Sequence, residues 1–165
     1  MWTVIKINKK KFNDLKNDFK KKLGSLPIFY SPKIKIQKFN KSKMKNYDFD
    51  LLGDYILCYH ENISGYKSTN LFKHCIGLKY FLDGFVQSQK DLEYFVKKCK
   101  NHEDQSGYVK QSFFNFNKNN NFQFLSGPFS NFFFKILEER GKKYFITLDN
   151  FKVSISKNKT LFKPI

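Results

Sequence analysis

The chain opens with alternating hydrophobic and polar residues and then changes to a helical repeat. Alternation over residues 2–7 predicts a strand with one face in a core. The following apolar residues recur every three or four positions, which predicts a helix over 12–23. Gly24 and Pro27 supply its end. The pattern is therefore a strand followed by an amphipathic helix.

Further strands are predicted at 34–39, 55–59 and 78–82. Residues 55–59 are entirely apolar, so this strand is expected inside a sheet. The Asn- and Lys-rich stretch 40–46 is expected to be an exposed connection.

Two more helices complete the first hundred residues. A short one is predicted over 70–75, and Ser88 can cap a longer one. The longer helix has an apolar stripe made of Leu92, Phe95, Val96 and Cys99. The order is then β-α-β-β-α-β-α, which predicts an α+β sandwich over residues 1–102.

The remainder of the chain has a different pattern. Residues 101–111 are polar and have no apolar period, which predicts a linker, placed over 103–114. From 115 to 165, short strand-like pieces alternate with turn signals at Gly127-Pro128, Gly141 and Asp149-Asn150. The pieces are 122–125, 132–137, 144–148, 153–156 and 161–162. Five short strands in so small a segment predict a small β-barrel.

The composition adds a strong positive charge to this outline. The 165 residues carry 31 Lys and Arg against 14 Asp and Glu, a net charge of +17. Residues 1–46 hold 14 Lys against 2 acidic residues, so most of the excess lies at the front. A field of that sign attracts polyanions, with nucleic acid as the first partner and an anionic membrane surface as the second.

The sequence predicts no membrane span. The longest uninterrupted apolar run has five residues, whereas a transmembrane helix needs about 20. The start of the chain has no signal-peptide pattern. The 3 cysteines are odd in number and spread out, which suits a reducing compartment. We therefore expect a cytoplasmic protein.

Lysines on and just before the first helix are candidates for nucleic-acid binding: Lys9, Lys10, Lys11, Lys16 and Lys20. Each lysine–phosphate contact releases counterions and makes binding salt-dependent. Lysine makes point-charge contacts, so sequence-specific base recognition gets little support. The alternative is a solvated helix face with no partner.

The sequence carries no motif for catalysis. A glycine-rich phosphate loop, G-x-S-x-G and H-E-x-x-H are all absent from it. Three Cys and His pairs come from separate elements, and no C-x-x-C joins them. The pairs are Cys58 with His60, His74 with Cys75, and Cys99 with His102. Because buried thiols and isolated histidines explain them more simply, we expect no enzyme activity, no metal and no cofactor.

The order of these parts resembles the NusG family of transcription elongation factors over nearly the whole chain. Met1-Trp2 and the segments 30–32, 51–57 and 77–81 resemble successive landmarks of the N-terminal (NGN) domain of that family. The sharpest motif is Phe122-Gln123-Phe124-Leu125-Ser126-Gly127-Pro128-Phe129, which resembles the start of the C-terminal KOW domain. The resemblance implies an NGN domain over 1–102 and a KOW domain, an SH3-like barrel, over 115–165.

Two positions depart from the general factor. Leu52-Gly53-Asp54-Tyr55 stands where the family usually has Phe-Pro-Gly-Tyr, and Phe134 stands where the KOW signature has a glycine. A similar loss of that glycine is seen in the specialised paralog RfaH. The resemblance is therefore closer to a specialised, RfaH-type paralog than to the housekeeping factor.

The resemblance implies RNA polymerase as the main partner. The NGN domain of the family lays a hydrophobic depression on the clamp helices of the polymerase. Tyr55 and Leu57 match its contact positions, and Tyr59 projects to the same side. The alternative is that these three residues are plain core.

A second polymerase contact is implied for the segment made of Lys67, Ser68, Thr69 and Asn70. It lies where the specialised paralog uses a hydroxyl-rich loop to touch the gate loop. The alternative is a helix N-cap by Ser68 or Thr69.

In the KOW part, Phe151 matches the family position that contacts ribosomal protein S ten and, in the general factor, also Rho. The alternative is a residue of the barrel core. The Phe-rich segment 129–137 fits helical spacing as well as a barrel. A switch between a helical hairpin and a barrel is therefore a further hypothesis.

These features predict a monomeric, non-enzymatic transcription elongation and antitermination factor. It would bind RNA polymerase, suppress pausing, touch upstream or non-template DNA, and recruit the ribosome through the KOW domain. The alternative is a stand-alone RNA-binding module, since β-α-β-β-α-β also describes an RRM.

Overall fold

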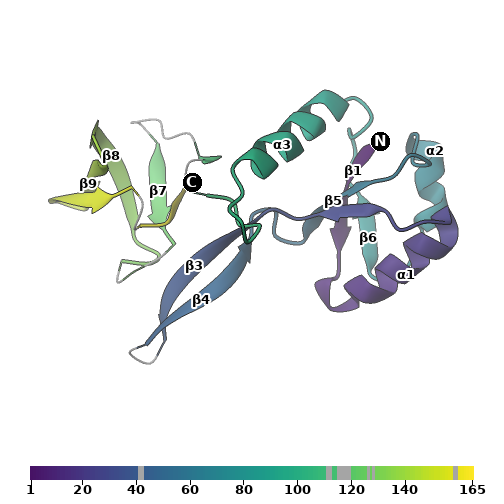
Figure 1. The fold of residues 1–165 in the computed structure, drawn as a ribbon, viewed down its shortest axis with the longest axis horizontal. Helices are drawn as coiled ribbons and strands as arrows, with labels where there is room; N and C mark the ends of the chain where they lie inside the picture. Colours follow the sequence, from purple (N-terminus) through teal and green to yellow (C-terminus); the bar gives the residue numbers. More distant parts are fainter. Residues whose placement is uncertain (41–42, 111–112, 115–119, 126, 128, 158–159) are drawn as a thin grey trace. The chain divides into compact units, whose positions relative to one another are not determined.

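The computed structural model describes the chain apart from residues 41–42, 111–112, 115–119, 126, 128 and 158–159. The described residues form helices and sheets, an α+β architecture (Figure 1). Ser126 and Pro128 of the motif over 122–129 lie outside the described residues, as do parts of the predicted linker and of the predicted C-terminal domain.

The chain divides into two compact units. The first unit consists of Met1–Pro32 and Asp50–Asn101, and the second unit of Lys33–Phe49 and His102–Ile165. This division differs from the predicted domains 1–102 and 115–165 because residues 33–49 group with the C-terminal part. A linker over 103–114 stays a prediction.

A four-stranded antiparallel sheet forms the centre of the first unit, in the order β2-β5-β1-β6. Its strands are β1 (Trp2–Ile7), β2 (Ile28–Tyr30), β5 (Tyr55–Tyr59) and β6 (Leu78–Phe81). The prediction of an interior strand at 55–59 is confirmed, since β5 lies between β2 and β1. The sequence pattern misses β2, which has only 3 residues.

One face of this sheet packs against α1 (Phe12–Leu23). Ile5 and Ile7 of β1 and Leu15 and Phe19 of α1 belong to one buried cluster. The alternation predicted for β1 and the helical repeat predicted for α1 are both confirmed. Gly24 ends α1 in the left-handed conformation with φ 80°, and its N–H donates to the Lys20 carbonyl at 2.9 Å.

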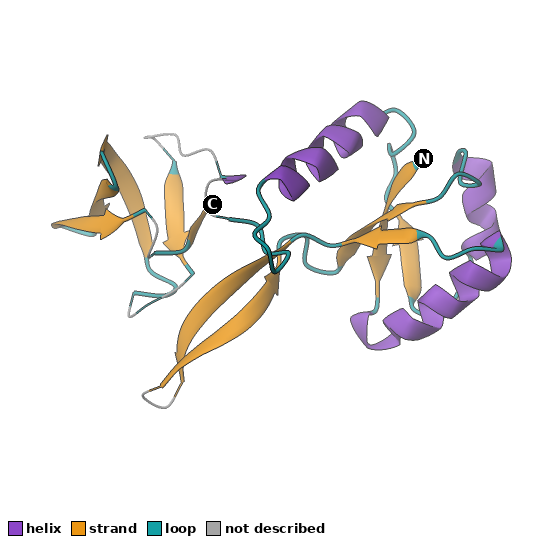
Figure 2. Cartoon of the chain, in the orientation of Figure 1, coloured by secondary structure: helices purple, strands orange, loops and turns teal. Residues whose placement is uncertain are grey.

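The other helical segments of the first unit are a 3-10 turn η1 (Lys9–Lys11), α2 (Tyr66–Thr69), a 3-10 turn η2 (Asn70–Phe72) and α3 (Gln89–Asn101). The helix predicted over 70–75 starts too late, because α2 begins at Tyr66 and η2 ends at Phe72. Helix α3 confirms the predicted apolar stripe and lies across the sheet from α1 (Figure 2). Within the described ranges, no helix is long and apolar enough to cross a membrane.

A long hairpin opens the second unit. Strands β3 (Lys33–Asn40) and β4 (Lys43–Asp50) form a two-stranded sheet. The prediction that 40–46 is a connection is wrong over β4. Residues 45–48 are exposed, so this strand forms through pairing with β3 and not through burial. It therefore has no hydrophobic face by which the sequence pattern could predict it.

Backbone and side-chain hydrogen bonds tie this hairpin to the segment after α3. The Val109 N–H donates to the Lys33 carbonyl at 2.7 Å. The Tyr108 hydroxyl donates to Asp48 Oδ1 at 2.9 Å. The base of the hairpin is thereby fixed to two residues that lie well beyond it in the chain, Tyr108 and Val109.

A five-stranded antiparallel sheet makes up the rest of the second unit, in the order β10-β9-β8-β7-β11. Its strands are β7 (Asn121–Phe124), β8 (Phe133–Arg140), β9 (Lys143–Leu148), β10 (Phe151–Ser156) and β11 (Phe162–Pro164). All five predicted strands are confirmed, and the turns at Gly141 and Asp149 have positive φ. Closure into a barrel stays a prediction, because β10 and β11 stand at the two ends of the order.

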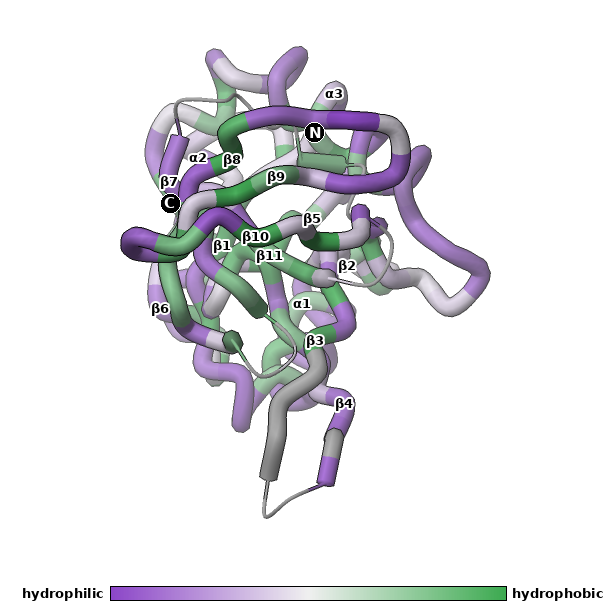
Figure 3. The backbone as a smooth tube through the Cα atoms, turned by 90° about the vertical axis from the view of Figure 1, so that its left-hand side faces the viewer, coloured by the Kyte–Doolittle hydropathy of each residue, from purple (hydrophilic) through white to green (hydrophobic). Residues whose placement is uncertain are grey.

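The core of the second unit is mostly aromatic. Phe122, Phe124, Phe134, Ile136, Tyr144, Ile146 and Phe162 form one buried cluster. Phe134 stacks on Phe124 with 4.2 Å between ring centroids. Strand β9 is correspondingly hydrophobic in Figure 3, whereas the turn between β8 and β9 is hydrophilic. The bulky side chain at position 134 is thus a structural part of this core.

Candidate functional site

An apolar hollow of about 420 Å³ opens on the first unit. It is lined by residues of β1, β5, α3 and the segments flanking β5 and β6: Val4, Leu52, Tyr55, Leu57, Leu82, Leu92 and Phe95. Among the described residues of this lining, Tyr55 alone brings a polar side-chain atom. We call this site the first-unit hollow.

Strand alternation positions the residues of the hollow. In β1, Ile5 and Ile7 belong to the buried cluster with α1, so Val4 points to the opposite face. In β5, Ile56 belongs to that cluster, and Leu57 points away from it. Because Val4 and Leu57 are direct cross-strand partners, they form one continuous surface.

Helix α3 and two turns complete the hollow. Leu92 and Phe95 are three residues apart on α3 and so lie on one helix face. Leu52 precedes Gly53, which has φ 60°, and the Tyr55 N–H donates to the Leu52 carbonyl at 3.0 Å. This tight turn carries the chain from Leu52 into β5 beside the hollow.

The hollow has a buried floor and an accessible rim. Leu57 is only 1% exposed and forms part of the floor. Leu82, just after β6, is 43% exposed and lies at the rim. Exposed apolar surface of this kind is typical of a site that binds another molecule.

A cationic and phenolic cluster adjoins the hollow at Tyr55. The Lys6 ammonium lies 5.2 Å from the ring centroid of Tyr55 and 5.6 Å from that of Tyr80. The two tyrosine hydroxyls are hydrogen-bonded at 2.8 Å. This bond raises the pKa of Tyr55 and lowers that of Tyr80, and the nearby phenols raise the pKa of Lys6. The rim beside Tyr55 therefore carries a positive charge held by two rings.

Of the three residues of β5 that the sequence predicts as polymerase contacts, two line the hollow and one does not. Tyr55 and Leu57 both line the hollow. Tyr59 lies outside it, 37% exposed, with its ring 5.3 Å from that of Trp2. Sequence reasoning missed Val4 and Leu82, although the alternation of β1 already separates Val4 from the core side of the strand.

The hydroxyl groups of the segment 67–70 are used within its own turn. Gly65 is the N-cap of α2, and Thr69 is the N-cap residue of η2 but makes no side-chain capping hydrogen bond there. Ser68 Oγ donates to the Gly65 carbonyl at 2.6 Å and accepts from the Gly65 N–H at 3.3 Å. Thr69 Oγ1 donates to the Tyr66 carbonyl at 2.7 Å. Lys67 and Asn70 are exposed.

The candidate lysines for nucleic acid have unequal surroundings. Lys9 Nζ forms an ion pair with Asp50 Oδ2 at 2.5 Å, which offsets its charge. Lys16 Nζ lies 4.5 Å from the ring centroid of Phe12. Lys10, Lys11 and Lys20 are exposed. These three are therefore the more available charges of the set.

Phe151 is exposed at the start of β10. Its side chain is 73% exposed, which contradicts the alternative that it belongs to the barrel core. It pairs with Leu148 across a tight turn in which Asp149 has φ 51°. The turn thus presents an aromatic side chain on an edge strand.

The cysteines are buried, and none of them forms a disulfide in the part of the chain that is described. Burial raises the pKa of the Cys58 thiol to about 12. Its neighbour His60 accepts the Asn62 N–H at Nδ1 and is bonded through Nε2 to Ser25 Oγ at 2.8 Å. Among the described residues, no cluster of three or more His, Cys, Asp or Glu side chains is arranged to hold a metal ion.

No protein-family model matches the sequence, and no curated protein matches it. Among solved structures, the chain is similar to one in the crystal structure of the MjSpt4:Spt5 complex in conformation B. The TM-score is 0.30 and the sequence identity 12%, over 100% of this chain and 98% of the other. A TM-score of 0.30 establishes neither a common fold nor a common function.

Proposed function

We propose that this protein is a transcription elongation and antitermination factor that binds RNA polymerase through the first-unit hollow. The observation that carries the proposal is the hollow itself, because its lining is apolar and includes Tyr55 and Leu57. These are the two residues that the NusG resemblance pairs with the clamp helices. Hydrophobic grooves commonly bind amphipathic helices in this way.

The energetic requirement is differential binding. A factor suppresses pausing only if it binds the active polymerase more tightly than the paused one. Apolar contacts in the hollow supply affinity, and the charge of Lys6 beside Tyr55 favours an acidic partner surface. No catalytic group is needed for this role, so the protein acts by binding alone.

The remaining contacts of the proposal come from other surfaces. In the segment 67–70, Lys67 and Asn70 are exposed, and we assign them the contact with the gate loop of the polymerase. Lys10, Lys11 and Lys20 are the lysines offered to upstream or non-template DNA. Phe151 is the exposed aromatic residue offered to ribosomal protein S ten, or to Rho. An RfaH-type specialisation rests on Phe134 and on the loss of the family's Phe-Pro-Gly-Tyr.

The RRM alternative requires an open sheet face on which bases stack. In this chain α3 packs on that face, where Leu92 and Phe95 line the hollow together with Val4. Gln89 of α3 also donates from Nε2 to the Trp2 carbonyl at 2.7 Å. An apolar hollow under a helix favours a protein partner over stacked bases.

The experiment compares Leu82→Ser with Leu71→Ser. Both leucines are exposed residues of the first unit, but only Leu82 lines the hollow. Purified variants are passed over immobilised core RNA polymerase after nuclease treatment and a high-salt wash. Truncation of an apolar side chain that is a hot spot of a protein interface costs about 2 kcal/mol, roughly 30-fold in affinity. We expect that loss for Leu82→Ser and wild-type retention for Leu71→Ser.

Elongation assays add a functional readout. The wild-type protein should shorten pauses on a defined template, and Leu82→Ser should not. Retention of Leu82→Ser at the wild-type level, with unchanged pausing, would contradict the proposal. Loss of wild-type retention after nuclease treatment would instead favour the RNA-binding alternative.

A further inference from the structure

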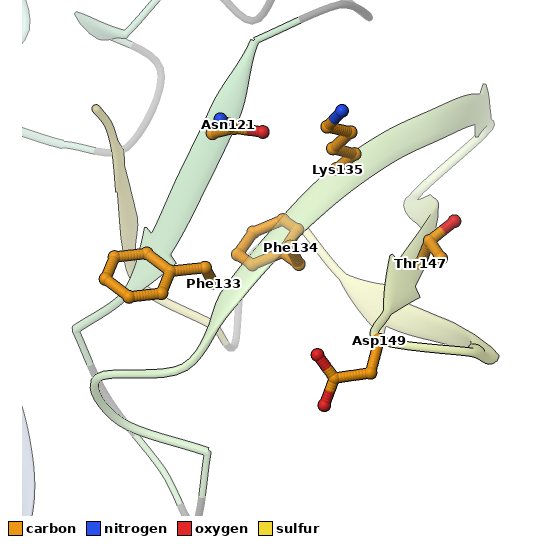
Figure 4. A pocket seen from close by; sticks show the side chains of 6 residues that line it. All are labelled: Asn121, Phe133, Phe134, Lys135, Thr147 and Asp149. Atoms are coloured by element: carbon orange, nitrogen blue, oxygen red, sulfur yellow. The ribbon is translucent and has the colours of Figure 1, made fainter.

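A second pocket, of about 370 Å³, lies on the sheet of the second unit. Its lining residues are Asn121, Phe133, Phe134, Lys135, Thr147 and Asp149. They come from β7, β8, β9 and the turn after β9 (Figure 4). This volume is within the range of small-molecule sites, about 300–1,000 Å³.

Strand register places the polar members of the pocket in one row. Asn121 pairs with Lys135, and Lys135 pairs with Thr147. Their neighbours Phe122, Phe134 and Ile146 belong to the buried core, so the row lies on the opposite, outer face of the sheet. Lys152 of β10 pairs with Thr147 and extends the row with a second lysine.

Phe133 gives this pocket an accessible aromatic ring. It is 60% exposed, whereas the next residue, Phe134, is buried. Two residues along β8 from Phe133, Lys135 projects from the same face of the strand. An aromatic ring beside a lysine on a sheet surface matches what single-stranded nucleic acid requires, since bases stack on the ring and phosphates pair with the cation.

The other side chains offer hydrogen-bonding groups of several kinds. The Asn121 amide both donates and accepts, the Thr147 hydroxyl does the same, and the Asp149 carboxylate accepts. For the side chains of Asn121, Lys135, Thr147 and Asp149, no hydrogen bond or ion pair is found within the described part of the chain. They are therefore free to bond a base edge or a sugar, which distinguishes this pocket from the apolar first-unit hollow.

We infer that this pocket binds a nucleotide of a single-stranded nucleic acid, with the base stacked on Phe133 and the adjoining phosphate paired with Lys135. Residues 101–165 carry 10 Lys and Arg against 5 acidic residues, so the surrounding field favours a polyanion. The inference goes beyond the proposed function, because it concerns the second unit and requires no polymerase.

The test measures the binding of the full-length protein to fluorescein-labelled 12-nucleotide RNA and DNA of the same sequence, by fluorescence anisotropy at several salt concentrations. Removing one stacking ring costs about 1–3 kcal/mol, so Phe133→Ala should bind roughly 5- to 150-fold more weakly with an unchanged salt slope. Lys135→Gln should reduce the slope by about 0.7, the value of one single-strand phosphate contact. Phe132→Ala is the matched control, since Phe132 is exposed and does not line the pocket.

A titration followed by amide chemical shifts locates the oligonucleotide independently of affinity. Shifts centred on Phe133, Lys135 and Thr147 support the inference. Tighter binding of RNA than DNA would show that a ribose hydroxyl bonds the polar row, and equal binding would show that base and phosphate suffice. If Phe133→Ala binds both oligonucleotides like wild type, all binding resides elsewhere and the inference is overturned. Loss of a protein partner by Phe133→Ala, with oligonucleotide binding intact, overturns it equally.

Discussion

Neighbouring phenylalanines of β8 have opposite environments. Phe134 is 3% exposed and touches Phe122, Phe124 and Phe162. Truncation of a buried Phe typically costs about 3–5 kcal/mol because it leaves a cavity. We expect Phe134→Ala to lower the free energy of unfolding of the second unit by that amount, measured by amide hydrogen exchange at Ile146.

Phe133→Ala is the control for this prediction. A substitution at an exposed position usually changes stability by no more than about 0.5 kcal/mol. Equal protection of Ile146 in both variants would mean that the aromatic core does not hold this sheet together.

Cys58 makes stability depend on pH in the alkaline range. Burial raises its pKa from 9.0 to about 12, so the folded state keeps a proton that the unfolded state has lost. The contribution of this group to stability is complete below pH 9 and is lost as pH rises toward 12. We expect chemical denaturation to show a steeper decline over this range for wild type than for Cys58→Ala. A parallel decline in both proteins would contradict the assignment.

At the scale of elements, Gly77 joins the turn before β6 to the start of the first helical region. It has φ 88°, and a Cβ there would lie 2.7 Å from the Lys11 carbonyl oxygen. Its own carbonyl accepts the Asn8 N–H at 2.8 Å. A larger residue would therefore push η1 away from β6.

Gly77→Ala should accordingly destabilise the first unit by roughly 3 kcal/mol, because backbone strain and steric overlap act together. Gly53→Ala is the matched control, with φ 60° and no atom within 4 Å of the new Cβ. It should cost only about 1 kcal/mol. Thermal unfolding of both variants checks the difference, and equal midpoints would contradict the clash.

The elements that the sequence predicts correctly carry a strong hydrophobic period. Strand β1 and helix α1 bury one face, so alternation and helical spacing reveal them. Strand β4 is not predicted, because its residues 45–48 are exposed and the strand is defined by its pairing with β3. Helix α2 begins early because Gly65 and Ser68 make its first turn, a signal spread over four residues without an apolar stripe.

At the scale of the whole molecule, the lysines of the first unit should determine its salt-dependent binding to duplex DNA. Lys10, Lys11 and Lys20 are exposed, while Lys9 is paired with Asp50. Each lysine that neutralises a phosphate of duplex DNA adds about 0.9 to the slope of log K against log salt. Replacing the three exposed lysines by Gln should lower that slope by this amount for each of them that binds a phosphate.

A second triple variant serves as the control. It has the same net charge as the first, but its three Lys→Gln replacements lie at other positions of the first unit. Lys73, Lys79 and Lys97 are exposed residues of the same unit. Their replacement by Gln should leave the slope close to that of wild type. Equal slopes for the two triple variants, measured by anisotropy titration, would mean that binding follows net charge and not position.

The candidate site was only partly predictable from the sequence, because its residues come from several separate elements. Tyr55 and Leu57 stand out in an apolar strand, but the hollow also needs Leu82 and the α3 residues Leu92 and Phe95. These come together only after β1, β5, β6 and α3 are assembled, and sequence spacing does not reveal which of these side chains will meet. Phe133 and Asn121 of the second pocket are likewise joined only by strand register.

The path of the chain limits how the molecule can be dissected. The first unit is discontinuous, since residues 33–49 leave it and group with 102–165. A single cut after Asn101 would separate the hairpin from Val109 and Tyr108. These two residues form hydrogen bonds with Lys33 and Asp48 of the hairpin. Neither fragment made by such a truncation would then correspond to one of the two units. A faithful separation replaces 33–49 by a short turn in one fragment and fuses the hairpin to the C-terminal segment in the other.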